Sequence, residues 1–143
     1  PPGVQVIKPE TSKTMRALMR MVVEKGTGRR AEIDGYRLGG KTGTAEKISA
    51  QGGYARKALL SSFVAAFPID EPRYVVLVML DEPHGTKATG GFATGGAVAA
   101  PTVGRLVARL GPLMGLEPVD RPQARPAAPV QNARALGPSV AAN

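Results

Sequence analysis

The sequence predicts an α+β fold, an antiparallel sheet with helices packed against it, on three observations. Two segments rich in β-branched and aromatic residues, 59–67 and 73–80, are separated by only five residues. So short a connection joins antiparallel neighbours, because a parallel crossover needs a dozen residues or more. Two segments with helical periodicity, 10–25 and 98–110, flank this pair. Helices and strands are therefore grouped along the chain, as in α+β domains.

The first helix is predicted over residues 10–25. Thr11 or Ser12 is expected to cap it, and Glu10 lies near the positive end of the helix dipole. Gly26 is expected to end it. Apolar residues recur at three- and four-residue spacing, which indicates a helix that buries one face. The side chains predicted to pack in the core are Met15, Leu18, Met19, Val22 and Val23.

Glycine-rich segments separate the later elements. We expect residues 26–30 to form a turn, residues 36–38 to form a short extended piece, and residues 85–96 to form a flexible loop. The second helix has Pro101 in its first turn, where proline is tolerated. Its predicted apolar face comprises Val103, Leu106, Val107 and Leu110.

The end of the chain differs in composition from the rest. Residues 117–143 hold five prolines, many alanines and few other apolar residues. We expect residues 1–116 to form the folded domain and residues 117–143 to form a disordered Pro/Ala-rich tail.

Composition limits the possible partners. The 143 residues carry a net charge of +8, with a pI of about 10.3, which favours anionic surroundings. Aromatic residues make up only 4%, and no nucleic-acid-binding motif accompanies Arg29-Arg30 or Arg56-Lys57, so no nucleic-acid partner is expected. The absence of cysteine excludes disulfides and thiolate metal sites. No apolar run approaches the length of about 20 residues that spans a membrane.

The stretch GGKTGT, residues 39–44, allows two interpretations. Read as GYRLGGKT from Gly35 to Thr42, it matches the phosphate loop of nucleotide hydrolases. The apolar strand YVVLVMLDEP, residues 74–83, resembles the magnesium-holding strand of transporter ATPases, so an NTP-binding protein is one alternative function. A phosphate loop, however, needs a buried strand before it and a helix after it. The charged segment 29–34 argues against a buried strand before the loop, and Gly43 directly after Thr42 argues against a helix after it.

Read from Lys41, the same stretch is K-T-G-T, a motif of serine acyltransferases that react with penicillin. In an extended segment, Lys41 and Gly43 lie on one face, and Thr42 and Thr44 lie on the other. The glycines leave room for an acyl-peptide to lie alongside as an added strand. The lysine charge favours a carboxylate on that peptide.

Residues 6–116 resemble the C-terminal part of the transpeptidase domain of class B penicillin-binding proteins, most of all the division-specific type. Four segments carry the resemblance in order: VVEKGTGRRAEIDGY (22–36), GGKTGTAEK (39–47), SSFVAAFPIDEPRYVVLVMLDEP (61–83) and GGAVAAPTVGRLV (95–107). The resemblance implies a partial penicillin-binding or serine β-lactamase-like transpeptidase fold that lacks the all-α subdomain. Both helices would lie on one face of the sheet. An exposed apolar patch would mark the place of the missing subdomain.

The resemblance also implies roles for the motif residues. The catalytic residues would be Lys41 and Thr44. Lys41 would organise the hydrogen bonds that relay protons around the catalytic serine, and the N–H of Thr44 would form half of the oxyanion hole. The hydroxyls of Thr42 and Thr44 would hold the terminal carboxylate of the substrate, and Gly43 would admit its backbone. The turn at residues 26–28 would lie behind the sheet and be structural only. No metal or cofactor is expected. The implied partners are peptidoglycan stem peptides ending in D-Ala-D-Ala, β-lactams, the remainder of the same domain and membrane proteins of a division complex.

The nucleophile of such enzymes is missing from the sequence. Their S-x-x-K and S-x-N motifs supply the attacking serine and its proton relay. We therefore expect a fragment, inactive alone, of an enzyme held at the periplasmic face of the inner membrane by an N-terminal segment outside this sequence. A non-catalytic scaffold domain of the same fold is a second alternative. The serines that begin neither motif are Ser12, Ser49, Ser61, Ser62 and Ser139.

Three further polar residues receive structural interpretations. His84, the only histidine, lies in the turn-like DEPHG and is expected to be exposed rather than catalytic. Asp81 and Glu82 follow an apolar strand. Because neighbouring residues on a strand point in opposite directions, we expect them to be strand-end polar residues and not paired carboxylates.

Overall fold

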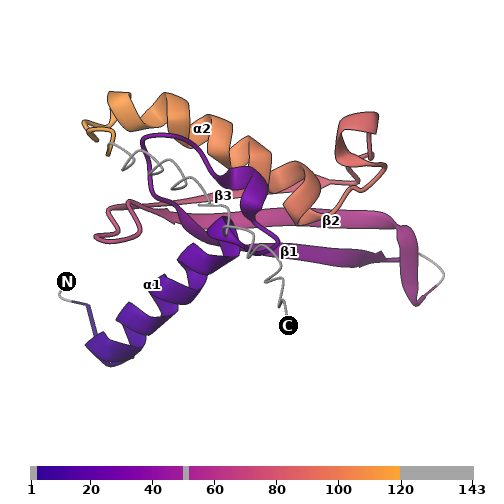
Figure 1. Cartoon of the computed structure of the whole chain (residues 1–143). Helices are drawn as coiled ribbons and strands as arrows, with labels where there is room; N and C mark the ends of the chain where they lie inside the picture. Colours follow the sequence, from indigo (N-terminus) through magenta and orange to yellow (C-terminus); the bar gives the residue numbers. More distant parts are fainter. Residues whose placement is uncertain (1–2, 50–51, 120–143) are drawn as a thin grey trace, which may run out of the picture.

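The computed structural model describes residues 3–49 and 52–119, without the side chains of residues 55–57. Within this part, three antiparallel strands form one sheet in the order β1-β2-β3, which confirms the α+β prediction (Figure 1). Strands β1 and β3 are therefore the edges of the sheet. The elements in chain order are α1 (Pro9–Glu24), the 3-10 helix η1 (Arg29–Ala31), β1 (Gly39–Ile48), β2 (Tyr54–Phe67), β3 (Tyr74–Asp81), the 3-10 helix η2 (Lys87–Thr89), the π-helical turn η3 (Gly95–Ala99) and α2 (Ala100–Leu113).

Alternation along the strands gives the sheet a buried face and an open face. On the buried face, the side chains of β2 pack against Val103 and Val107 of α2, and Val76, Val78 and Leu80 of β3 are partly buried against the same cluster. The open face carries apolar residues as well. The buried β2 residues are Phe63, Ala65 and Phe67, and the open-face residues of β3 are Val75, Leu77 and Met79, which are 71%, 56% and 54% exposed.

Helix α1 lies against β1 on the side of the sheet away from α2 (Figure 1). The expectation that both helices share one face is therefore wrong. The glycine pair before Lys41 explains the arrangement, because consecutive strand residues face opposite sides. A Cβ added to Gly39 would lie 3.1 Å from the backbone nitrogen of Arg20 in α1, whereas one added to Gly40 would lie 2.6 Å from the Phe63 ring.

The N-terminal end of α1 differs in detail from the sequence-based expectation. Pro9 occupies the first turn and Lys8 is the N-cap, so Thr11 and Ser12 lie inside the helix and cap nothing. At the other end, the N–H of Gly26 donates to the carbonyls of Met21 and Val22. The predicted core stripe is mostly wrong, because only Val23 is fully buried. Met15 and Leu18 of that stripe are 48% and 50% exposed.

The strands and the second helix extend beyond their predicted limits. Strand β2 begins at Tyr54, five residues earlier than expected, and a register shift after Glu46 accommodates the extra residues. Helix α2 follows η3 directly, with Pro101 in its first turn as predicted. The predicted loop 85–96 contains η2, which Thr86 and Thr89 close with a capping box.

Contacts with the folded part continue through the first residues of the predicted tail. Leu116, the last residue of the predicted domain, is 6% exposed, and in the predicted tail the N–H of Val119 donates to the carbonyl of Gly35 over 2.7 Å. Residues 120–143, the greater part of the predicted tail, lie outside the described residues.

Candidate functional site

The K-T-G-T motif lies in the middle of the edge strand β1. Lys41 pairs with Val64, and the next three motif residues pair in turn with the residues that precede it in β2. This strand continues to Ile48, so no helix follows Thr42. A phosphate loop requires such a helix. The NTP-binding interpretation of GYRLGGKT is therefore wrong.

The motif side chains are divided between the two faces of β1 as predicted. Gly43 lies on the open face beside Ser62, whose Oγ would be only 2.5 Å from an added Cβ. Lys41 is exposed, and its Nζ donates to the carbonyl of Thr42 over 2.7 Å. No competing carboxylate therefore holds the Lys41 ammonium within the part of the chain that the structure describes.

The two threonine hydroxyls of the motif are held by neighbouring segments. Thr44 Oγ1 accepts a hydrogen bond from the N–H of Gly95 at 3.0 Å. Thr42 Oγ1 lies 2.9 Å from Thr27 Oγ1, and either hydroxyl can donate. Position 95 has room only for glycine, because a Cβ there would lie 2.4 Å from the carbonyl oxygen of Gly43. The expected structural turn at residues 26–28 thus reaches the motif directly through Thr27.

These hydroxyls open into a cavity of about 470 Å³ beside β1, which we call the threonine cavity. Its polar lining combines five threonines with two arginines, and it contains neither aspartate nor glutamate. Arg30 donates to the carbonyls of Ala88 and Ala97, which fastens the segment after β3 to η1. The lining residues with polar side chains are Thr27, Arg29, Arg30, Thr42, Thr44, Thr89 and Thr94.

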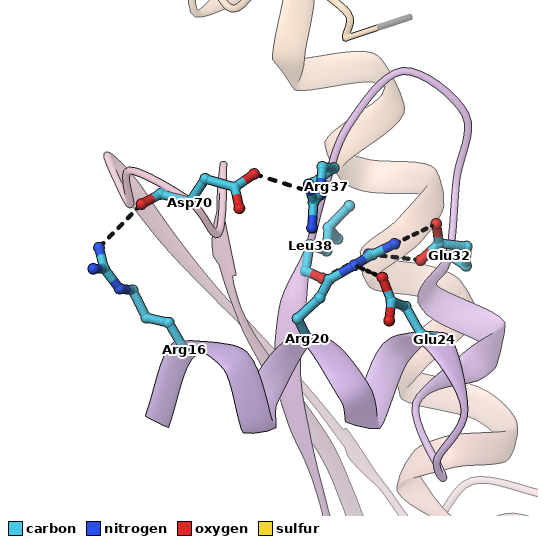
Figure 2. A network of polar contacts seen from close by, with 7 residues as sticks. All are labelled: Arg16, Arg20, Glu24, Glu32, Arg37, Leu38 and Asp70. Carbon is cyan, nitrogen blue, oxygen red and sulfur yellow. Dashed lines mark hydrogen bonds and ion pairs between the residues drawn. The ribbon is translucent and has the colours of Figure 1, made fainter. Parts of the chain in front are cut away.

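A cluster of charges fixes the chain just before the motif (Figure 2). Arg20 of α1 donates through both terminal nitrogens to the carboxylate of Glu32, at 2.7 and 2.9 Å, and through Nε to Glu24 at 2.8 Å. It also donates to the carbonyl of Leu38 at 2.9 Å. Arg20 therefore connects α1, the segment after η1 and the start of β1. We call Arg20, Glu24, Glu32 and the Leu38 carbonyl the Arg20 clamp.

The clamp keeps Arg20 charged. Burial opposes the charge, but the hydrogen bonds and charges of Glu32 and Glu24 outweigh it, so the pKa of Arg20 is raised above its ordinary value. A second pairing, Arg37 with Asp70 at 3.4 Å, is more exposed and links the start of β1 to the turn between β2 and β3 (Figure 2).

The other candidate residues lie away from the threonine cavity. Asp81 and Glu82 both contact Lys47 Nζ, at 3.0 and 2.8 Å, so the expectation that they point apart is wrong. Glu82 has a φ of 47°, past the end of β3, which breaks the strand alternation. The hydrogen bonds that Lys47 donates to Glu82 and Asp81 raise the pKa of its ammonium group.

His84 is exposed, as expected, with Nδ1 3.1 Å from the carbonyl of Glu82. The Arg56 and Lys57 side chains lie outside the described part. Among the described residues, no group of three or more His, Cys, Asp or Glu could hold a metal ion, and no helix is long and apolar enough to cross a membrane.

Sequence reasoning did not single out three residues that the fold brings to the motif or its support. They are Thr27, Gly95 and Arg20. Gly95 lies 51 residues after Thr44, and no local pattern relates the two positions. The only sequence signal was the Gly-Thr-Gly turn, whose central threonine is flanked by residues without side chains.

Comparison with known proteins places this geometry in a family. Residues 1–108 match the penicillin binding protein transpeptidase domain. The chain is 44% identical over 125 residues to the probable peptidoglycan D,D-transpeptidase FtsI of Caulobacter vibrioides, covering 82% of this chain and 21% of that protein. It is 45% identical over 114 residues to stage V sporulation protein D of Bacillus subtilis, covering 80% and 17%. The chain thus spans about a fifth of the length of these relatives.

Solved structures agree with the sequence relatives. Penicillin binding protein 3 of Mycobacterium tuberculosis, complexed with ampicillin, matches with a TM-score of 0.72 at 29% identity, covering 86% of this chain and 28% of that one. The transpeptidase domain of penicillin-binding protein 3 from Burkholderia pseudomallei matches with a TM-score of 0.70 at 36% identity, covering 83% and 34%. In fold and in sequence, the chain belongs to the penicillin-binding protein transpeptidase domain family.

Proposed function

We propose that the chain forms the K-T-G-T wall of a peptidoglycan D,D-transpeptidase active site, which cross-links stem peptides by serine acyl transfer and reacts with β-lactams. In this role Thr42 and Thr44 hold the terminal carboxylate of the D-alanyl donor. Gly43 lets the donor backbone approach, and the Thr44 N–H stabilises the oxyanion. Lys41 organises the proton relay around a serine and a lysine supplied from outside this sequence.

The observation that carries the proposal is the position of the motif on an edge strand. A peptide can pair with the free edge of β1 as an additional strand. The Thr42 and Thr44 hydroxyls then meet its carboxylate, while Lys41 and Gly43 face the open side of the sheet. An oxyanion-hole donor such as the Thr44 N–H contributes a factor of about 10² to 10³ in rate.

The two serines near the motif, Ser61 and Ser62, lack the features of a catalytic nucleophile, which supports a nucleophile outside this sequence. Ser61 is fully buried, and its hydroxyl donates to the carbonyl of Ala93. Ser62 faces Gly43, but neither serine has a lysine three residues later to activate it. We therefore propose that the serine acylated in the whole enzyme lies outside this sequence. We further propose, from the family resemblance, that the whole enzyme acts at the periplasmic face of the inner membrane. Its partners there would be D-alanyl peptides, β-lactams and division-complex proteins.

The test combines covalent and non-covalent binding. A fluorescent penicillin should give no covalent band with the 143-residue chain, because the chain lacks S-x-x-K. Millimolar N-acetyl-D-Ala-D-Ala should nevertheless shift the amide NMR signals of Thr42 and Thr44. The same peptide with an amidated C-terminus should not shift them, because the carboxylate is the group that is held. A stoichiometric covalent band, or equal shifts with both peptides, would contradict the proposal.

A further inference from the structure

We propose that Arg29 and Thr27 extend the Thr42–Thr44 pair into an anion site selective for carboxylates. Arg29 supplies its positive charge, and Thr27 is a positioning residue that orients the Thr42 hydroxyl. The site itself is inferred from the threonine cavity. Its assignment to the donor carboxylate rests on the proposed function.

The hydrogen-bond directions make Thr44 a donor toward the cavity. A threonine hydroxyl has one hydrogen to donate and two lone pairs to accept. Thr44 Oγ1 already accepts from the N–H of Gly95, a bond in which its own hydrogen takes no part. That hydrogen is therefore available to a ligand with acceptor atoms.

Thr27 makes the Thr42 hydroxyl a hydrogen-bond donor toward the cavity as well. The two hydroxyl oxygens lie 2.9 Å apart, so one of them must donate to the other. When Thr27 donates, the hydrogen of Thr42 is free to point at a ligand beside Thr44. An anion in the cavity favours this arrangement, because it accepts hydrogen bonds only. Thr27 thus acts on the ligand through Thr42.

The charge of the cavity is positive and is not neutralised within its lining. Arg29 and Arg30 both line it, and no acidic residue does. Across residues 3–49 and 52–119, the ion pairs involve other cations, namely Arg20, Arg37 and Lys47. Both arginines are exposed, but Arg30 donates hydrogen bonds to the carbonyls of Ala88 and Ala97. Arg29 is therefore the guanidinium of the wall that is not engaged in such bonds within the described residues.

The arrangement suits a carboxylate better than a phosphate. A guanidinium and two neighbouring hydroxyls match the two oxygens of a planar carboxylate. A doubly charged tetrahedral phosphate is usually cradled by several backbone N–H groups. In the threonine cavity the N–H of Gly95 is already bonded to Thr44.

The experiment titrates the 143-residue chain in dilute solution with acetate, inorganic phosphate, N-acetyl-D-Ala-D-Ala and its C-terminal amide, following the amide NMR signals of Thr27, Thr42 and Thr44. The variants are Arg29→Ala, Arg29→Gln and Thr27→Val. Arg109→Ala is the matched control, because it removes one exposed arginine of α2 that does not line the threonine cavity. Thermal unfolding of each variant establishes that it folds.

We expect acetate and the free peptide to bind about threefold to tenfold more weakly to both Arg29 variants, with Arg109→Ala unchanged. Thr27→Val should weaken binding and reduce the shift at Thr42 more than the shift at Thr44. Equal affinities for Arg29→Ala and Arg109→Ala would overturn the anion site. Tighter binding of phosphate than of acetate would overturn its selectivity for carboxylates.

The two proposals fail in different ways. Acetate binding that depends on Arg29, without any preference for the free over the amidated peptide, would leave the anion site standing and contradict its use for the D-alanyl donor. Binding of the free peptide that does not depend on Arg29 or Thr27 would leave the proposed function standing and overturn the anion site.

Discussion

At the scale of single residues, Phe63 supports the K-T-G-T strand and the Thr27 turn from the buried face of the sheet. It is fully buried, and its ring reaches past Gly40 to Gly28, so it supports both the strand before Lys41 and the turn that carries Thr27. Phe63→Ala should lower the free energy of unfolding by about 3–5 kcal/mol, because it removes a buried ring and leaves a cavity. Urea denaturation measures the loss.

The matched control for this prediction is Phe92→Ala. Phe92 is 66% exposed, and removing its ring should change the free energy of unfolding by less than about 0.5 kcal/mol. Similar losses for the two variants would show that the Phe63 ring is not the support that its burial indicates.

At the scale of elements, the Arg20 clamp decides where β1 begins. Arg20→Ala removes the paired bonds to Glu32 and the bond to the Leu38 carbonyl, and it leaves a partly buried carboxylate. We expect a loss of about 2–3 kcal/mol and faster hydrogen exchange at Gly40 and Lys41. Arg20→Lys should recover little, because an ammonium cannot form the paired geometry.

The pH dependence and a neighbouring arginine test the same clamp. Because the pKa of Arg20 is raised, its stabilisation is present below the ordinary arginine pKa and is lost only as pH rises through the folded value. The Arg20→Ala penalty should therefore be equal at about pH 6 and about pH 9. Arg16→Ala, which removes one bond to the Asp70 carbonyl, should cost less than about 0.5 kcal/mol. A penalty that shrinks at the higher pH would contradict the assignment.

The elements also show what the sequence could and could not predict. The short loop 68–72 sufficed for the β2–β3 hairpin, and the glycines around Lys41 sufficed for an extended K-T-G-T, because both are local constraints. The pairing of Tyr54 with Ile48 depends on a register shift between β1 and β2 that leaves no pattern in either strand. The contacts of Thr27 with Thr42, and of Gly95 with Thr44, depend on how distant segments meet. Only the folded chain brings them together.

At the scale of the whole molecule, the open face of the sheet is apolar and exposed along β3. Val75, Leu77 and Met79 of β3 are more than half exposed on this face, and Met15 and Leu18 of the α1 stripe are about half exposed. The helical periodicity of that stripe predicts an apolar face that packs against a partner. The described residues do not cover that face, and the prediction that it is buried is therefore mostly wrong.

The open face, together with the free edge of β3, should make the chain self-associate. Exposed apolar patches and unprotected edge strands both favour association. We expect sedimentation velocity to show a sedimentation coefficient that rises with concentration. The double variant Val75→Thr, Leu77→Lys should remain monomeric, with its free energy of unfolding changed by less than about 0.5 kcal/mol, because both side chains are mainly exposed. The control is Leu113→Lys, at an isolated site that is 82% exposed at the end of α2, which should still associate. A wild-type chain that stays monomeric and melts cooperatively at high concentration would show that the open face needs no cover.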